Sequence, residues 1–373
     1  MKKYFILIFV CSTTILSLPS CSSDPSFPAD QVKQMDAVVT VAMSTYNIPG
    51  VIAAVWIPGK GTWIKGFGLA NKSTGEAMDP SMLFRIGSLT KSFTATVILQ
   101  LVDEGKLSLD DTLDKYITDP IIPNASNITV RQVANMSSGL FNYTEDTTFL
   151  LAVKANPNRV WAPEELINYS IAHAPYFAPG TNFYYSNTNY VLLSMVIKKI
   201  TGNSVGSEMQ SRIISPLGLS NTSFPTTSAM PSGSCHGYSL SDDGTSIVEA
   251  DALDPSVTLG AGANISDIYN LKTWVETVAK GALVSDASHT AQLTCINEPD
   301  STTDKYCFGI MKVDNFIGHD GVINGYNSMM AYLPSNGAVI IVMENLNPTT
   351  KFDVAKDIFM GVAKVALPND VSW

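Results

Sequence analysis

Apolar and polar positions alternate in a way that predicts β-hairpins near both ends of the chain. Residues 51–57 and 62–69 are apolar-rich and flank Pro-Gly-Lys-Gly, a turn sequence. Residues 328–333 and 338–344 flank Pro-Ser-Asn-Gly in the same way. Residues 29–46 carry apolar side chains at helical spacing, which predicts a helix before the first hairpin. We therefore expect the two ends of the chain to meet in one antiparallel sheet.

The middle of the chain has helical periodicity instead. Strands at both ends with helices between them predict an α+β domain, in which terminal helices flank an antiparallel sheet and an inserted, mainly helical lobe covers about residues 88–285. A single bilobed domain over residues 30–368 follows, and the cleft between its lobes is the expected site. The predicted helices span residues 88–104, 163–172, 187–200, 265–279 and, after the second hairpin, 351–366.

The N-terminus has the pattern of an export signal. Two lysines precede an apolar run that is too short and too interrupted for a membrane span, so residues 1–20 are predicted to be a signal peptide. Leu-Pro-Ser-Cys then ends at Cys21, which resembles a bacterial lipobox with Cys21 as the lipidated residue; cleavage without a lipid is the alternative. Residues 21–29 would form a tether. The prediction is a periplasmic or surface lipoprotein that contacts the membrane only through its lipid anchor.

Charge and cysteine content narrow the possible functions. The formal net charge is −10, so nucleic-acid phosphates would repel the chain and no nucleic-acid partner is expected. Cys295 and Cys307 are close enough in sequence to close a loop by a disulfide in an oxidising compartment, which leaves Cys235 as a buried free thiol. No Cys/His spacing fits a zinc site. The acidic positions between residues 242 and 254 are expected to form a solvated loop, with a calcium site as the alternative.

The chemistry-bearing residues begin with Ser88 and Lys91, which fall at the start of a strongly apolar helix and one turn apart. A serine hydroxyl becomes a nucleophile when a neighbouring group takes its proton, and a partly desolvated lysine can do this. Tyr185 and Asn187 lie one residue apart just before another predicted helix. A tyrosine beside a lysine can act in proton transfer, and an amide can hold a substrate carbonyl.

A third group of residues stands just before the C-terminal hairpin. Gly318-His319-Asp320-Gly321-Val322 suggests a strand edge that offers the Val322 N–H as an oxyanion donor opposite the Ser88 N–H. Gly321 would let a substrate approach the strand closely. Alone, each of these three patterns also fits a helix cap, a polar loop or a turn.

Their order along the chain, Ser-x-x-Lys, Tyr-x-Asn and His-x-Gly, resembles the three motifs of the serine β-lactamase and penicillin-binding-protein superfamily. The likeness is greatest to D-alanyl-D-alanine carboxypeptidases and class C β-lactamases, and it covers about residues 30–366. It implies that Ser88 forms an acyl-enzyme, that Lys91 and Tyr185 relay protons, and that Asn187 and His319 bind the substrate. It also implies that no metal or organic cofactor is needed.

One position departs from the family pattern. Asp320 stands where relatives often carry a hydroxyl that holds the free carboxylate of the substrate, and a carboxylate there would repel another one. Asp320 is therefore a candidate specificity residue. The first hypothesis is an exported carboxypeptidase-like hydrolase acting on small peptides, with a peptidoglycan stem peptide as one candidate. The alternatives are an esterase or D-amino-acid amidase or aminopeptidase, and a non-catalytic penicillin-binding sensor.

Overall fold

The computed structural model describes residues 26–298, 304–349, 351 and 353–373. The predicted signal peptide, Cys21 and most of the tether lie outside these residues. The side chain of Phe27 is buried in the core, so the chain is fixed to the domain from this residue onward. At the other end, the ring of Trp373 packs beside Phe316 and Phe359, which extends the domain past residue 368. No helix in the described part of the chain is long and apolar enough to cross a membrane.

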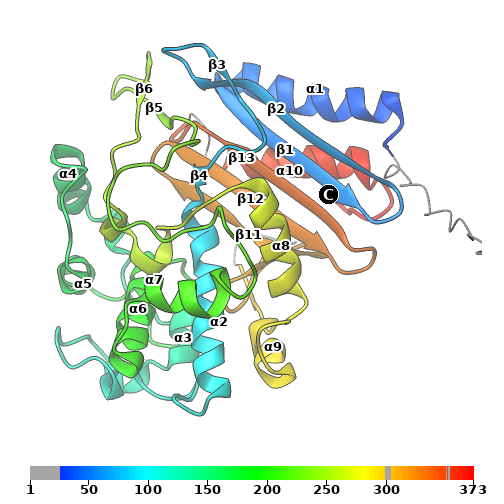
Figure 1. Cartoon of the computed structure of the whole chain (residues 1–373). Helices are drawn as coiled ribbons and strands as arrows, with labels where there is room; N and C mark the ends of the chain where they lie inside the picture. Colours follow the sequence, from blue (N-terminus) through cyan, green and yellow to red (C-terminus); the bar gives the residue numbers. More distant parts are fainter. Residues whose placement is uncertain (1–25, 299–303, 350, 352) are drawn as a thin grey trace, which may run out of the picture.

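Both ends of the chain contribute to one antiparallel sheet, as predicted (Figure 1). Within the described residues it has nine strands in the order β3-β2-β1-β13-β12-β11-β10-β9-β8, and the two end hairpins join because β1 pairs with β13. The strands are β1 Gly50–Ile57, β2 Gly61–Asn71, β3 Glu76–Ala77, β8 Ile296–Asn297, β9 Asp304–Tyr306, β10 Met311–Val313, β11 Phe316–Ile323, β12 Tyr326–Leu333 and β13 Ala338–Glu344.

Two terminal helices cover one face of this sheet, α1 (Ala29–Tyr46) and α10 (Val354–Ala366) (Figure 1). Alternate residues of β1 explain how the sheet holds two cores. Val51 packs in the core beneath α1 and α10, whereas Ile52 packs in the core on the opposite face. Because both faces of the central strands are covered, these strands are apolar almost throughout.

The helical lobe lies on the opposite face and is built around α2 (Figure 1). Most residues of α2 are buried, since α6, α7 and α9 pack around it. Two short antiparallel pairs lie outside the main sheet, β4 Phe84–Arg85 with β7 Ile265–Ser266, and β5 Tyr238–Leu240 with β6 Ile247–Glu249. Tyr238 of β5 belongs to the core beneath α1 and α10. The helices of the lobe are α2 Thr90–Asp103, α3 Val130–Ala134, α4 Thr147–Ala155, α5 Pro163–Ile171, α6 Asn187–Thr201 and α7 Val205–Met209.

Helix α8 (Ile268–Ala279) falls in the range expected for the helical lobe but packs on β12 and β13 of the sheet. It begins three residues later than expected, because Asp267 caps it by accepting a hydrogen bond from the Asn270 N–H. Helix α9 (Asp286–Gln292) follows. The predicted disulfide between Cys295 and Cys307 then links the segments at β8 and β9, and Cys235 is a buried free thiol.

Candidate active site

Ser88 lies in a 3₁₀ turn, Gly87–Leu89, that leads directly into α2. Gly87 takes a left-handed conformation with φ +52°, and a Cβ there would lie 2.9 Å from the Val322 backbone nitrogen. Only glycine therefore allows β11 to approach this turn so closely. The contact brings the Val322 N–H beside the turn that carries the Ser88 N–H, which is the arrangement expected for a pair of oxyanion donors.

Lys91 is fully buried one helical turn after Ser88. Its Nζ donates hydrogen bonds at 2.8 Å to Ser88 Oγ, to Asn187 Oδ1 and to the backbone oxygen of Ala261. Burial lowers the pKa of Lys91 well below 10.5, although the charge of Asp320 works in the opposite direction. The lowered pKa makes the Lys91 ammonium easier to deprotonate, and the amine that results is within reach of the hydroxyl proton of Ser88.

Tyr185 lies over the same amine, with Lys91 Nζ 4.8 Å from the centre of its ring. Desolvation and the charge of Asp320 raise the pKa of Tyr185 well above 10, while a hydrogen bond with Ser88 works against this shift. Tyr185 thus holds its proton and is placed as a proton donor, and the base in this pair is Lys91. The sequence predicts both residues at the site, but only the structure shows that burial lowers the pKa of Lys91 and raises that of Tyr185.

Asn187 begins α6 and its side chain is fixed at both ends. Its Oδ1 accepts from Lys91, and its Nδ2 donates to Thr144 Oγ1 at 3.1 Å. Its own N–H donates to Asn142 Oδ1 at 3.0 Å. The loop that holds Asn142 and Thr144 was not singled out by any sequence motif, yet it orients the Asn187 amide toward Lys91.

Gly321 has a different role from the one expected. A Cβ at this position would lie 2.2 Å from the backbone oxygen of Ile86 and 2.5 Å from Ser328 Oγ, both inside the protein. The absence of a side chain therefore lets β11 pack against the segment before Ser88, and it does not open a path for substrate. This corrects the sequence-based interpretation, which could not tell on which side of β11 the missing side chain falls.

His319 is buried on β11 and lies near Tyr185. Its Nε2 is 3.2 Å from the hydroxyl of Tyr306, whose ring meets Tyr185 edge to face at a centroid distance of 5.6 Å. Tyr306 is fully buried and completes a cluster with Tyr185 and His319. Tyr306 could not be found from the sequence, because no motif spacing links β9 to the other site residues.

Asp320 does not point at the Ser88 hydroxyl. Its register partner on β12 is Met329, which belongs to the core beneath α1 and α10, whereas the partner of His319 lies on the opposite face. The Asp320 carboxylate lies 3.2 Å from His319 Nδ1 and hydrogen-bonds with Asp353. The expectation that Asp320 faces the end of a bound substrate therefore finds no support in the geometry.

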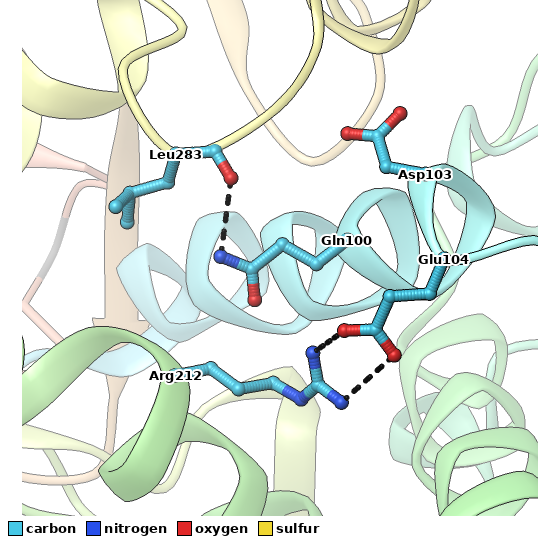
Figure 2. Close-up of a pocket in the computed structure, with 5 residues that line it drawn as sticks. All are labelled: Gln100, Asp103, Glu104, Arg212 and Leu283. Atoms are coloured by element: carbon cyan, nitrogen blue, oxygen red, sulfur yellow. Dashed lines mark hydrogen bonds and ion pairs between the residues drawn. The ribbon is translucent and has the colours of Figure 1, made fainter.

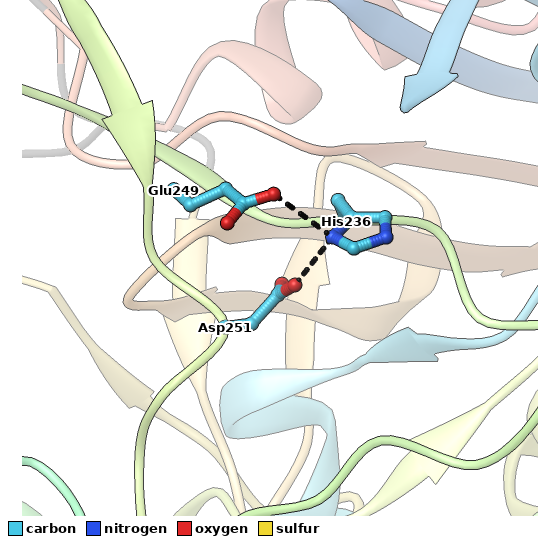
Figure 3. Close-up of side chains that lie close together, drawn as sticks. All are labelled: His236, Glu249 and Asp251. Atoms are coloured by element: carbon cyan, nitrogen blue, oxygen red, sulfur yellow. Dashed lines mark ion pairs between the residues drawn. The ribbon is translucent and has the colours of Figure 1, made fainter. Parts of the chain in front are cut away.

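Two other polar groupings lie away from Ser88. A pocket at the far end of α2 is lined by Gln100, Asp103, Glu104, Arg212 and Leu283, and an ion pair joins Arg212 to Glu104 across it (Figure 2). Near β5 and β6, His236 Nδ1 lies 2.8 Å from Asp251 and 3.3 Å from Glu249 (Figure 3). These two acids thus flank a histidine, where the sequence suggested a solvated loop or, as the alternative, a calcium site. Neither grouping adds a residue to the Ser88 site.

The fold and this arrangement are those of a serine hydrolase: a serine in a 3₁₀ turn and a buried lysine in the first turn of the following helix lie beside an antiparallel sheet. Residues 35–363 match the family model described as Beta-lactamase. The chain belongs to this family and hence to the serine β-lactamase and penicillin-binding-protein superfamily, as the three motifs predicted.

Individual relatives span most of the chain. A D-stereospecific amidohydrolase from Streptomyces sp. is 31% identical, with a TM-score of 0.79 over 91% of this chain and 98% of its own. A D-amino acid amidase from Ochrobactrum anthropi SV3, at 24% identity and a TM-score of 0.80, covers 91% of this chain and 99% of its own, and supports the fold alone. The unguisins hydrolase ungD' of Aspergillus campestris is 26% identical over 89% of this chain, which spans 65% of that protein's length.

Proposed function

We propose that this protein hydrolyses amide bonds next to D-configured amino-acid residues through an acyl-enzyme on Ser88. The observation that carries the proposal is the buried contact of 2.8 Å between Lys91 Nζ and Ser88 Oγ, beneath Tyr185. The 31% identity to a D-stereospecific amidohydrolase over nearly the whole chain supports the substrate class. Small peptides and amides are the expected substrates.

The geometry supports a two-step reaction. Lys91 takes the proton of Ser88 Oγ as this oxygen attacks the substrate carbonyl carbon, and the N–H groups of Ser88 and Val322 stabilise the oxyanion that forms. A proton then passes through Lys91 and Tyr185 to the leaving nitrogen as the C–N bond breaks. Water attacks the resulting ester, gives up a proton to the same groups, and releases the acid product and free Ser88.

The carboxypeptidase hypothesis remains the second candidate, with a peptidoglycan stem peptide as substrate. The order of the three motifs favours it, but Asp320 stands where a hydroxyl would hold a terminal carboxylate, and its side chain is turned to His319 and Asp353 instead. An esterase would use the same acyl chemistry. A penicillin-binding sensor would acylate once, and the intact pair of Lys91 and Tyr185 argues for turnover instead.

A substrate panel separates these activities. The panel holds D- and L-phenylalanine amide, a D-Ala-D-Ala peptide, a short p-nitrophenyl ester and nitrocefin, each followed by product release. We expect D-phenylalanine amide to be hydrolysed well ahead of the L form. Ser88→Ala should abolish turnover, whereas Ser81→Ala, which changes an exposed serine, should not. Equal rates on both enantiomers would reject the proposed stereospecificity, and turnover by Ser88→Ala would reject the nucleophile.

We also propose that the protein is an exported lipoprotein anchored through Cys21. The supporting observation is the lipobox-like Leu-Pro-Ser-Cys after an apolar run. Membrane fractionation of the wild type and of Cys21→Ser tests this. Equal solubility of the two proteins would reject the anchor.

A further inference from the structure

The surroundings of His319 determine where its ring protons lie. Nδ1 is 2.5 Å from the backbone oxygen of Asp320 and 3.2 Å from its carboxylate. A carbonyl oxygen and an ionised carboxylate accept hydrogen bonds and cannot donate them, so Nδ1 must carry a proton. In the neutral ring Nε2 is then an acceptor, which matches its contact of 3.2 Å with the Tyr306 hydroxyl.

The carboxylate of Asp320 is held in its charged form. Burial alone would raise the pKa of Asp320, but hydrogen bonds with His319 and Asp353 and the charge of Lys356 keep it well below 3.8. The adjoining Asp353 behaves in the opposite way, since burial and the charge of Asp320 raise its pKa well above 3.8. The negative charge is therefore favoured on Asp320, beside His319, and the protonated form is favoured at Asp353.

Charged and titratable groups reach this cluster from several elements. In the described part of the chain, the pairing of β10 with β11 ends at Gly318, so both His319 and Asp320 lie where the edge of β11 is open. The groups that act on His319, Asp320 or their immediate neighbours are Lys91 from α2, Tyr185 from the segment before α6, Glu298 after β8, Asp304 and Tyr306 from β9, and Asp353 and Lys356 at the start of α10.

We infer that Asp320 is a positioning residue that works through His319. It holds the imidazole with Nδ1–H turned toward β11 and Nε2 directed at Tyr306 beside Tyr185, and it places a buried negative charge next to the ring. On this basis Asp320 does not select substrates by the charge of their end. The kinetic part of the test rests on the proposed function, whereas the spectroscopic part needs only the folded protein.

Nuclear magnetic resonance of protein labelled with ¹⁵N-histidine reads the tautomer directly. The chain has only four histidines, so the His319→Asn variant assigns the signal of His319. We expect the neutral ring to show the Nδ1–H form. In Asp320→Asn the share of the Nδ1–H form should fall, because the adjacent negative charge that favours it is gone. An Nε2–H form in the wild type, or an unchanged tautomer in Asp320→Asn, would overturn the inference.

Kinetics on D-phenylalanine amide give a second readout. Asp320→Asn should lose about 10- to 100-fold in kcat with KM nearly unchanged, because a hydrogen bond to a charged group is lost. In the double variant with His319→Asn, Asp320→Asn should lower kcat no further, since both changes disrupt the same pair of side chains. The matched control is Asp314→Asn, at an acid in the β10–β11 turn that bonds Ser372.

Three kinetic results would contradict the inference. The first is additive losses in the double variant, and the second is an equal loss in Asp314→Asn. The third is a tenfold change in the ratio of kcat/KM for acid-ended and amide-ended forms of one peptide, which would mean that Asp320 faces the substrate. If the wild type hydrolyses no D-amino-acid amide, the proposed function fails while the tautomer of His319 still decides the role of Asp320.

Discussion

Replacing Gly321 by alanine tests how closely β11 must approach the Ser88 turn. A methyl group at 321 would lie 2.2 Å from the Ile86 backbone oxygen and 2.7 Å from Leu89 Cδ1. Ordinary contact between carbon and oxygen needs about 1 Å more than the shorter distance. The nearest atom is backbone, so a side-chain rotation cannot relieve the clash. The strand and the turn must therefore move apart by about this amount.

The size of the effect follows from that displacement. Overpacking of this kind costs about 1–3 kcal/mol of folding free energy. Moving a reacting group by about 1 Å can slow an enzyme by about 10²-fold. Because the Val322 N–H lies on β11 and Ser88 lies on the turn, Gly321→Ala should separate the two oxyanion donors. We expect kcat/KM to fall by about 10²-fold together with this loss of stability.

A matched variant separates the loss of stability from the loss of catalysis. In Gly66→Ala the new methyl group would lie 2.1 Å from the backbone oxygen of Met78, a similar clash on β2 at the other side of the sheet. Urea denaturation and kcat/KM on D-phenylalanine amide should be measured for both variants. Both should be destabilised, but only Gly321→Ala should lose turnover per folded molecule. Full turnover in Gly321→Ala would refute the reasoning.

Three further predictions follow from the structure. Since burial lowers the pKa of Lys91, kcat/KM should rise with pH through that lowered value. Removal of Lys91 or Tyr185 alone should lower kcat by roughly 10²–10⁴-fold, and removal of both should lower it by far less than the product of the two single losses. Burial raises the pKa of Glu298 from 4.5 to about 7, so the folded state binds an extra proton between these values and stability falls as pH rises through this window. Glu298→Gln should therefore raise the free energy of unfolding by about 1–3 kcal/mol at pH 8 and not at pH 4, as measured with urea. Replacing Cys295 and Cys307 by serine should lower that free energy by about 2–3 kcal/mol, and a reductant should lower the melting temperature of the wild type alone.

Much of the fold follows from local sequence patterns, because each hairpin carries its own turn residues and each helix its own apolar stripe. The boundaries depend on finer signals. The helix predicted from residue 88 begins instead as a 3₁₀ turn at Gly87–Leu89, since the left-handed Gly87 must fit against Val322. The helix predicted from residue 265 begins after the Asp267 cap, since β7 pairs with β4 first. Periodicity alone does not detect such long-range pairings.

In the candidate site, too, local patterns were predictable from the sequence and long-range contacts were not. Ser88 and Lys91 are recognisable because one helical turn fixes their distance, and the structure brings Lys91 to Asn187 as well. The Ala261 oxygen and Tyr306 come from distant segments whose spacing to the motifs carries no information. The neighbours of a strand residue are set by register, which long-range pairing decides. The sequence thus predicted the motif residues of the site, but not the Ala261 oxygen and the Tyr306 hydroxyl that contact Lys91 and His319.

The position of the site at the seam between the two lobes links catalysis to packing. Ser88 lies in the 3₁₀ turn before α2 and Lys91 lies in the first turn of α2, whereas the Val322 N–H belongs to the sheet. Lys91 keeps its lowered pKa only while the seam excludes water, because hydration would restore the ammonium form and block proton transfer from Ser88. A change that loosens the contact between Gly87 and Val322 should therefore remove both the oxyanion donors and the base. Activity should then be lost at lower denaturant concentrations than the global fold.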